Sequence, residues 1–209
     1  MGIKWKPQTR MSGHIIMDIV DRCLSANSLF IVGIDGCGGA GKSRLAAEVR
    51  AALASRGRDV SVVQMDDFYL PSALRNGALT LDVIGSAFDW RRLRDEVLAP
   101  LTAGQPARYQ RYDWPSDALA EWHDIPHGLV IVEGVYSTRV ELEPFYDLTV
   151  WVECPRPIRL ARGIERDGEA ARRQWEEEWM PAEDRYVKEQ SPHTRADLIY
   201  SEPVVTPTV

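Results

Sequence analysis

The sequence has little of what several classes of protein need. Its 25 lysines and arginines are outnumbered by 31 aspartates and glutamates, and the net charge of −6 argues against a general nucleic-acid-binding protein. It has three cysteines and no Cys-x-x-Cys or His/Cys pattern, so we expect neither a disulfide framework nor a His/Cys metal site. No apolar run approaches the roughly 20 residues of a membrane-spanning helix, and the start shows no signal-peptide pattern. We therefore expect a cytoplasmic protein with no membrane or nucleic-acid partner.

Apolar runs alternate with helical patterns along the chain. The apolar runs predict five buried strands, at residues 29–34, 59–65, 128–134, 147–154 and 196–201. Helical spacing predicts helices at residues 14–24, 43–57, 89–101, 157–167 and 169–190, the last interrupted by Pro181. Residues 107–114 alternate as in an edge strand or a hairpin arm. The pattern predicts one three-layer α/β/α domain over residues 12–201, with about five parallel strands, between flexible tails at 1–11 and 202–209.

A glycine-rich loop between the first strand and the next helix carries the complete G-x-x-x-x-G-K-[ST] (Walker A) pattern. Glycines let successive backbone N–H groups curl toward phosphate oxygens, and the N-terminus of the helix adds its partial positive charge. Lys42 adds a mobile cation, and the Ser43 hydroxyl can bind Mg²⁺. The loop predicts a P-loop NTPase fold and a nucleoside triphosphate site made of Gly36, Cys37, Gly38, Gly39, Ala40, Gly41, Lys42 and Ser43.

Acidic residues end two other predicted strands. Asp66 and Asp67 end one, and Glu133 ends another. Because ligands of open α/β sheets gather at the carboxyl ends of the strands, these carboxylates are candidates for accepting a proton from an attacking hydroxyl or for positioning Mg²⁺. The alternative is that Asp66 and Glu133 cap the turns that follow them. Their place beside the glycine-rich loop favours the chemical role.

Arginines cluster in the C-terminal third. Arg159, Arg162 and Arg166 recur at spacings of three and four, so they share one face of a helix, and Arg172 and Arg173 follow. A cationic face of this kind can clamp a phosphoryl group in transfer. The alternative is a solvated helix whose arginines pair with the many nearby glutamates, and the residues alone leave both open.

Taken together, these segments resemble the uridine kinase and phosphoribulokinase family of P-loop kinases, from about Leu29 to Tyr200. MDDFY resembles the family's D-S-F-Y segment, with Asp67 in place of the serine, and VIVEGVY resembles its V-I-x-E-G strand end. SAFDWRRLRDEVLAPLTAGQPARYQRYDW and DLTVWVECPRPIRLARGIERD resemble its central segment and the entrance to its lid. The phosphate loop alone is common to many NTPases, and the order and spacing of the other segments make the resemblance specific.

The resemblance implies an ATP- and Mg²⁺-dependent phosphotransferase that acts on a hydroxyl of a small molecule, which in uridine kinases is the ribose 5′-hydroxyl. It implies Asp66 as general base, with Lys42 and Arg166 at the transferred phosphoryl group and Arg162 beside the nucleotide. Mg²⁺ would be held by Ser43, Asp66 and Glu133. The implied acceptor-binding residues are Asp66, Tyr69, Asp82, Tyr112, Trp114, Glu133, Arg166 and Arg173. For the aromatic residues, ordinary half-buried packing is the alternative.

Three departures from the family pattern leave the acceptor open. Asp117 stands where uridine kinases have a base-reading histidine, Asp82 has shifted spacing, and Gly163 replaces one of the paired lid arginines. Nucleosides, pantothenate-like molecules and sugar phosphates all stay candidates, and the second hypothesis is a P-loop hydrolase or regulatory switch. Because a kinase must exclude water while the phosphoryl group moves, we expect residues 162–183 to close over ATP as a lid.

Overall fold

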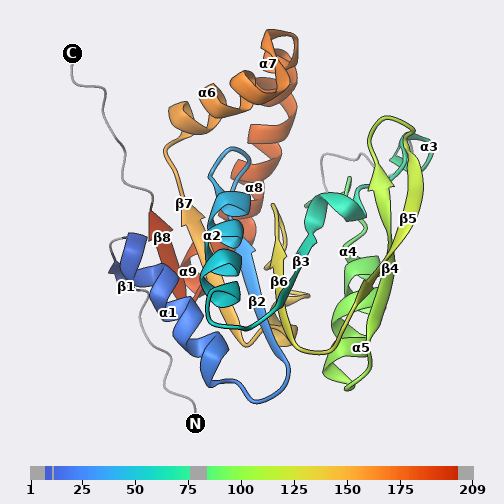
Figure 1. Cartoon of the computed structure of the whole chain (residues 1–209). Coiled ribbons are helices and arrows are strands. Elements are labelled where there is room, and N and C mark those ends of the chain that lie inside the picture. The colour runs from blue at the N-terminus through green and yellow to red at the C-terminus, as the bar shows by residue number, and fades with distance from the viewer. Residues whose placement is uncertain (1–7, 11, 76–83, 202–209) are drawn as a thin grey trace.

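The computed structural model describes residues 8–10, 12–75 and 84–201. These residues form a six-stranded parallel sheet in the order β1-β8-β7-β2-β6-β3 and a separate antiparallel pair, β4-β5 (Figure 1). The strands are β1 (Gln8–Arg10), β2 (Phe30–Asp35), β3 (Val60–Gln64), β4 (Ala107–Asp113), β5 (Ala118–Ile125), β6 (Leu129–Glu133), β7 (Leu148–Glu153) and β8 (Leu198–Ser201). Five of the six parallel strands are those that the apolar runs predict, and residues 107–114 form the predicted hairpin arm.

Apart from the short helices α3 and α9, which the sequence did not predict, the helices occupy the predicted segments. They are α1 (Ser12–Ser25), α2 (Lys42–Ala54), α3 (Ser72–Arg75), α4 (Trp90–Arg92), α5 (Ala99–Thr102), α6 (Arg156–Asp167), α7 (Arg172–Gln174), α8 (Met180–Gln190) and α9 (Pro192–Arg195). A π-helical stretch, Leu93–Leu98, joins α4 to α5, and a second one, Trp175–Trp179, joins α7 to α8. Short 3-10 turns lie at Met65–Phe68, Glu143–Phe145 and Glu169–Ala171. Asp89 caps α4, its carboxylate accepting the N–H of Arg92 at 3.2 Å.

Alternate strand residues face two different helical layers. Val32 and Ile34 of β2 are buried together with Val49 of α2, in the core that α1 and α2 cover. Ile31, one position away, is buried with Leu93, in the core on the side of α4 and α5. Neighbouring strand residues point to opposite faces of a sheet, so these clusters define two helical layers with the sheet between them. The three-layer α/β/α fold is thereby confirmed.

The N-terminal segment corrects one expectation. Gln8–Arg10, predicted to lie within a flexible tail, pair in parallel with β8 and form the edge of the sheet. The edge of β8 offers backbone N–H and C=O groups that any extended segment can use, and such pairing needs no apolar sequence signal.

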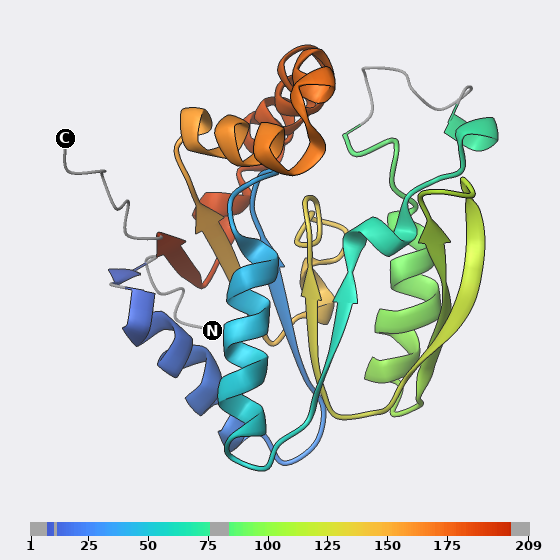
Figure 2. The ribbon, with the colours of Figure 1, turned by 45° about the horizontal axis from the view of Figure 1, so that its top comes forward.

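The charged C-terminal helices rise above the carboxyl ends of the sheet. Figure 2 shows α6, α7 and α8 as a helical hairpin over the ends of β2 and β7. Pro181, predicted to interrupt this stretch, lies in the first turn of α8, and the helix continues through it. Proline has no N–H to donate to the carbonyl of residue 177. The wider π-helical turn of Trp175–Trp179 directly precedes Pro181, so the helix changes its hydrogen-bond pattern where that bond is missing. Within the described residues, no helix combines the length and apolar character needed to cross a membrane.

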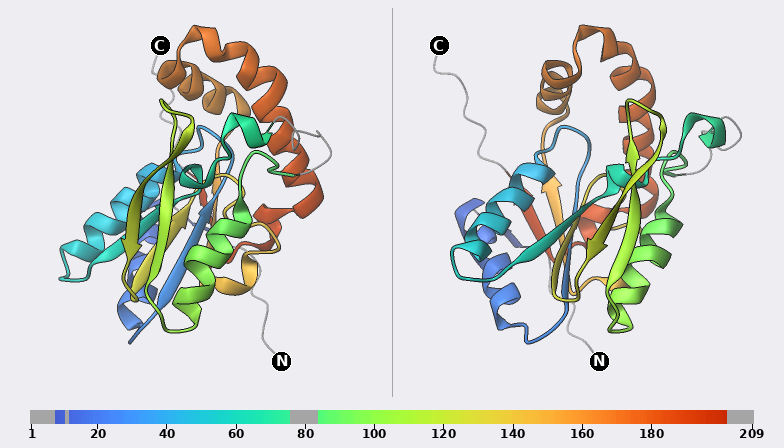
Figure 3. Two further views of the ribbon diagram at one scale, coloured as in Figure 1. Left: turned by 90° about the vertical axis from the view of Figure 1, so that its right-hand side faces the viewer. Right: turned by 45° about the vertical axis from the view of Figure 1, so that its right-hand side comes forward.

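The β4–β5 hairpin is fixed to the turn that follows β3. Figure 3 shows the hairpin alongside the helix formed by α4 and α5. At the turn Met65–Phe68, the hydroxyl of Tyr109 donates to Asp67 at 2.7 Å, and the ring of Tyr109 stacks on Phe68 at 4.8 Å. Burial raises the pKa of the Asp67 carboxyl. Asp67 therefore anchors the turn, while its exposed neighbour Asp66 is free to face the large cavity described below.

Tyr109→Phe should lower the free energy of unfolding by about 1–3 kcal/mol, because it leaves the buried Asp67 carboxylate without its hydroxyl donor. Urea unfolding measures the change. Arg108→Ala, which removes an exposed ion pair with Asp124, is the control and should stay within about 1 kcal/mol of the parent. Equal effects of the two substitutions would mean that the Tyr109–Asp67 bond does not hold the turn.

Candidate active site

A cavity of about 930 Å³ lies at the carboxyl ends of the strands. One end is formed by the glycine-rich loop and the start of α2, and the other by residues of α3, the residue after β4 and the segment after β6. The residues that line it include Gly38, Gly39, Lys42, Ser43, Asp66, Tyr69, Arg75, Phe88, Trp114, Glu133, Arg162, Gly163, Arg166, Trp175 and Glu183. Segments that are far apart in the sequence thus line the same cavity.

The glycine-rich loop wraps around the amine of Lys42. The Nζ atom donates to the carbonyl of Cys37 at 3.0 Å, and only 8% of Lys42 is exposed. Gly39 has a φ of +73°, and a Cβ there would stand 2.5 Å from the carbonyl oxygen of Arg159 in α6. The loop therefore needs glycine at this position, both for its left-handed backbone and for its contact with α6. The N-terminus of α2 begins inside this loop, at Lys42.

Ser43 and Glu133 meet at the floor of the cavity. The Ser43 hydroxyl donates to Oε1 of Glu133 at 2.8 Å, and Glu133 is 4% exposed. Burial raises the pKa of the Glu133 carboxyl, and the cation of Lys42 opposes this shift. Within the described part of the chain no three His, Cys, Asp or Glu residues form a group that could hold a metal. A hydroxyl and one carboxylate suit Mg²⁺, which usually takes phosphate and water as its other ligands.

Aromatic side chains form the wall beyond Asp66. The ring of Tyr69 lies 4.5 Å from Trp114, 5.0 Å from Phe88 and 5.5 Å from Tyr112, measured between centroids. Tyr69 and Trp114, two of the predicted acceptor-binding residues, line the cavity. Tyr112 lies behind this wall, 2% exposed, with its hydroxyl donating to Asp117 at 2.6 Å. Tyr112 therefore supports the wall instead of lining it.

The predicted arginines divide into two groups. Arg162 and Arg166 line the cavity, the first donating to the Gly39 carbonyl at 3.4 Å and the second paired with Asp167 at 2.7 Å. Arg173 lies apart from the cavity, with 84% of its side chain exposed and an ion pair to Glu177 at 2.7 Å. The structure thus does not bring Arg173 to the site, because it falls on the outer face of the hairpin.

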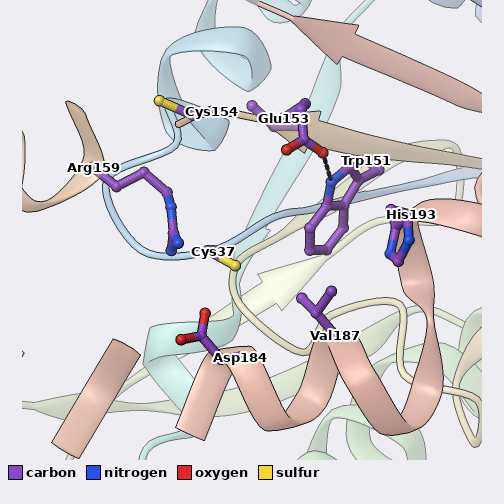
Figure 4. A pocket seen from close by; sticks show the side chains of 9 residues that line it. Cys37, Trp151, Glu153, Cys154, Arg159, Asp184, Val187 and His193 are labelled. Carbon is purple, nitrogen blue, oxygen red and sulfur yellow. Dashed lines mark hydrogen bonds between the residues drawn. The ribbon is translucent and has the colours of Figure 1, made fainter. Parts of the chain in front are cut away.

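Four further predicted residues lie off the wall or beyond what the structure describes. Gly36, Cys37 and Ala40 belong to the loop but not to the wall of the large cavity. Cys37 lines a smaller cavity of about 250 Å³ behind the loop, together with Trp151 and Asp184 (Figure 4). Asp82 lies outside the described residues.

A buried ion pair separates the two cavities. Glu183 of α8 accepts the N–H of Gly38 at 2.9 Å and pairs with Arg159 at 2.9 Å, and both partners are at least nine-tenths buried. Glu183 lines the large cavity and Arg159 the small one. Sequence reasoning missed Glu183, since no local signal separates it from the many glutamates around it.

Gly163, where the family pattern has an arginine, lies against Trp175. A Cβ at Gly163 would stand 2.4 Å from the indole ring, and the indole N–H donates to Asp167 at 2.9 Å. Trp175 is 2% exposed and also contacts the position of Gly38. Close packing between the two legs of the helical hairpin thus accounts for the missing arginine.

Comparison with known proteins agrees with this geometry. Residues 31–205 match the model of the phosphoribulokinase / uridine kinase family. The uridine kinase of Halobacterium salinarum is 28% identical over 144 residues, which cover 66% of this chain and 62% of that protein. The uridine kinase of Ureaplasma urealyticum is 26% identical over 193 residues, covering 86% and 92% respectively. A solved structure of a possible uridine kinase from Bacillus stearothermophilus has a TM-score of 0.71 at 23% identity, and covers 90% of this chain and 98% of that one.

A parallel sheet with a glycine-rich loop at its carboxyl edge, strand-end carboxylates and an overlying helical hairpin defines the class of P-loop kinases. Within that class, the chain belongs to the phosphoribulokinase / uridine kinase family. Both activities that give this family its name are phosphoryl transfers.

Arg159→Met should lower the free energy of unfolding by about 3–5 kcal/mol, because it leaves Glu183 as a buried carboxylate without its cation. Adding Glu183→Gln should recover part of this loss, since the amide oxygen can still accept the Gly38 N–H. Chemical denaturation of the two single variants and the double variant measures the coupling. Arg156→Met, which breaks an exposed pair with Asp184, is the control. A loss at Arg159 no larger than at Arg156 would contradict the role of the buried pair.

Proposed function

We propose that this protein is a kinase that transfers the γ-phosphoryl group of ATP, with Mg²⁺, to a hydroxyl of a nucleoside or a related small metabolite. One observation carries the proposal: Asp66 lies on the wall of the same cavity as Lys42 and Ser43, with the aromatic wall of Tyr69 and Trp114 beside it. A carboxylate between a phosphate-binding loop and an aromatic pocket is where a kinase needs its base. The uridine kinase relatives support a nucleoside as the acceptor.

The residues divide the chemistry among them. The loop N–H groups and Lys42 would hold the β- and γ-phosphates, and Ser43 and Glu133, with Asp66, would hold the metal. Bound Mg²⁺ neutralises charge that develops on the phosphate oxygens. Asp66 accepts the proton of the acceptor hydroxyl as that oxygen attacks the γ-phosphorus, the bond from that phosphorus to the bridging oxygen breaks, and ADP leaves with the bridging oxygen. Arg162 and Arg166 stabilise negative charge on the transferred group. Arg166 must first exchange its contact with Asp167 for one to phosphate.

The helical hairpin above the loop is the proposed lid, residues 162–183 of a single domain at 12–201. Arg162, Arg166 and Trp175 belong to it and line the cavity from above. Its closure would exclude water while the phosphoryl group moves, which is what separates a kinase from a hydrolase.

An acceptor other than a nucleoside is the second candidate, and Asp117 favours it. The carboxylate at this position is engaged by Ser72 and Tyr112, so it is not available to read a base as the family's histidine does. An acceptor screen that follows ADP formation across nucleosides, vitamins and sugars, with a blank lacking acceptor, separates the candidates. Turnover in the blank equal to that with every acceptor would mean a hydrolase.

Asp66→Asn should reduce acceptor-dependent ADP formation by about 10²–10⁴-fold, because the amide cannot accept the hydroxyl proton. ATP affinity, measured by calorimetry, should change little. Asp124→Asn, an exposed aspartate on β5, serves as control and should keep parental turnover. Parental turnover in Asp66→Asn would remove Asp66 as the base.

A non-hydrolysable ATP analogue should slow amide hydrogen exchange across residues 162–183, because closure over the nucleotide protects that backbone. Exchange in α1, on the far side of the core, should stay unchanged and serves as the internal reference. Identical exchange in residues 162–183 with and without the analogue would argue against a closing lid.

A further inference from the structure

Arg75 lines the large cavity, and one of its hydrogen-bond donors has no partner among the described residues. It ends α3, and its guanidinium lies 4.6 Å above the ring of Tyr69. Its side chain is 21% exposed, and its buried Nε–H has no hydrogen-bond partner in the part of the chain that the structure describes. An arginine carries five N–H donors, and a buried donor without a partner is costly, so such groups call for an explanation.

The nearby carboxylate does not provide that partner. Asp117 accepts the N–H of Ser72 at 2.9 Å, the hydroxyl of Ser72, and the hydroxyl of Tyr112 at 2.6 Å. Nη2 of Arg75 lies 3.7 Å from Oδ1 of Asp117, beyond hydrogen-bond distance. These bonds, above all that from the Ser72 hydroxyl, hold the pKa of Asp117 at about 2. Asp117 is thus occupied in fixing the start of α3 to the hairpin, and it orients Arg75 without saturating it.

Arg75 also stands apart from the cations of the phosphate end. Lys42 comes from the glycine-rich loop, and Arg162 and Arg166 from α6 above it. Figure 1 shows α3 beside the end of the β4–β5 hairpin, across the opening from α6 and α7. The aromatic wall of Tyr69 and Trp114 belongs to the same side as Arg75, and Tyr69 covers one face of its guanidinium. A cation at this place is far better placed for the acceptor than for ATP.

We propose that Arg75 binds an oxyanion, a carboxylate or a phosphate, on the acceptor, so that the substrate is a hydroxylated anion rather than a neutral nucleoside. This inference rests on the proposed kinase function and names the acceptor class of that same cavity. Stacking on Tyr69 holds the guanidinium flat, so that its edge presents a planar fork of donors that matches an oxyanion. The acceptor hydroxyl would then lie at Asp66 and its anionic end at Arg75, with Tyr69 and Trp114 beside it.

The test uses acceptors in matched pairs that differ only in the anion: pantothenate with panthenol, gluconate with glucose, and glycerol 3-phosphate with glycerol, together with uridine and cytidine. Binding is measured by calorimetry in the presence of a non-hydrolysable ATP analogue, and transfer by ADP formation with ATP. The variants are Arg75→Met and Arg75→Lys, with Arg108→Met as a control at an exposed side chain of β4.

We expect either the carboxylates or the phosphate to bind and to react at least 10-fold better than the matched neutral compounds. The pairs that show this difference identify the anion that the site prefers. Arg75→Met should weaken that anion's binding and raise its KM about 10- to 100-fold, with kcat and the KM for ATP nearly unchanged. Arg75→Lys should restore part of the affinity, and Arg108→Met should behave as the parent.

Two results separate this inference from the proposed function. Neutral nucleosides phosphorylated efficiently and equally by the parent and Arg75→Met would overturn the anionic acceptor while upholding the kinase. Arg75-dependent binding of an anion without any acceptor-stimulated ADP formation would uphold the anion site and overturn the kinase. Equal binding of both members of every pair would overturn the inference whatever the turnover.

Discussion

The buried carboxylate of Asp35 joins the three segments on which the site depends. It ends β2 with no exposed surface, and it accepts the N–H of Gly36 at 2.7 Å, the N–H and hydroxyl of Thr138 at 2.9 Å each, and the hydroxyl of Tyr186 at 2.6 Å. The entrance of the glycine-rich loop, the turn after β6 and helix α8 therefore meet on one side chain. Burial raises the pKa of the Asp35 carboxyl, and these hydrogen bonds oppose that shift. A buried carboxylate is tolerable only when its oxygens are satisfied in this way, so the three segments are constrained together.

This constraint reaches the chemistry through α8. Tyr186 and Glu183 lie three residues apart on that helix, so they share a face. The Tyr186 hydroxyl donates to Asp35, and Glu183 accepts the N–H of Gly38. The C-terminal leg of the helical hairpin, α8, is thereby fixed to Asp35, directly before the loop, and to Gly38 within it. A loop whose shape is set before the nucleotide arrives loses less entropy on binding, and catalysis by positioning gains directly from that. The proposed motion of the lid then falls to α6, α7 and the turn between them.

Local patterns predicted the parts of this site that are determined locally. Each of the five buried strands, like the glycine-rich loop, depends on the residues of its own segment, and the structure contains them at the predicted places. Distinctions between similar neighbours could not be predicted, because distant segments decide them. Asp67 is buried because Tyr109 of the hairpin bonds it, while Asp66, one residue earlier, lines the cavity. Glu183 differs from the glutamates around it through its bonds to Arg159 and Gly38. Arg173 lies outside the cavity because the fold of the helical hairpin leaves its side chain exposed. Arg75 belongs to no motif, and its position in the cavity depends on α3, the ring of Tyr69 and the nearby carboxylate of Asp117.

The placement of charge in the cavity makes sense for an acidic protein. A net charge of −6 repels both ATP and an anionic acceptor at long range, so attraction must come from cations concentrated within the cavity. Cations at a single end would let the two anions compete for the same place, whereas the structure has Lys42, Arg162 and Arg166 at the loop and lid, and Arg75 on α3. Asp66 and Glu133 lie on the same wall and disfavour any anion that is not neutralised by one of these groups. In the proposed reaction, two separate cationic ends would hold the two anionic substrates apart, and the acceptor hydroxyl would meet the phosphorus beside Asp66.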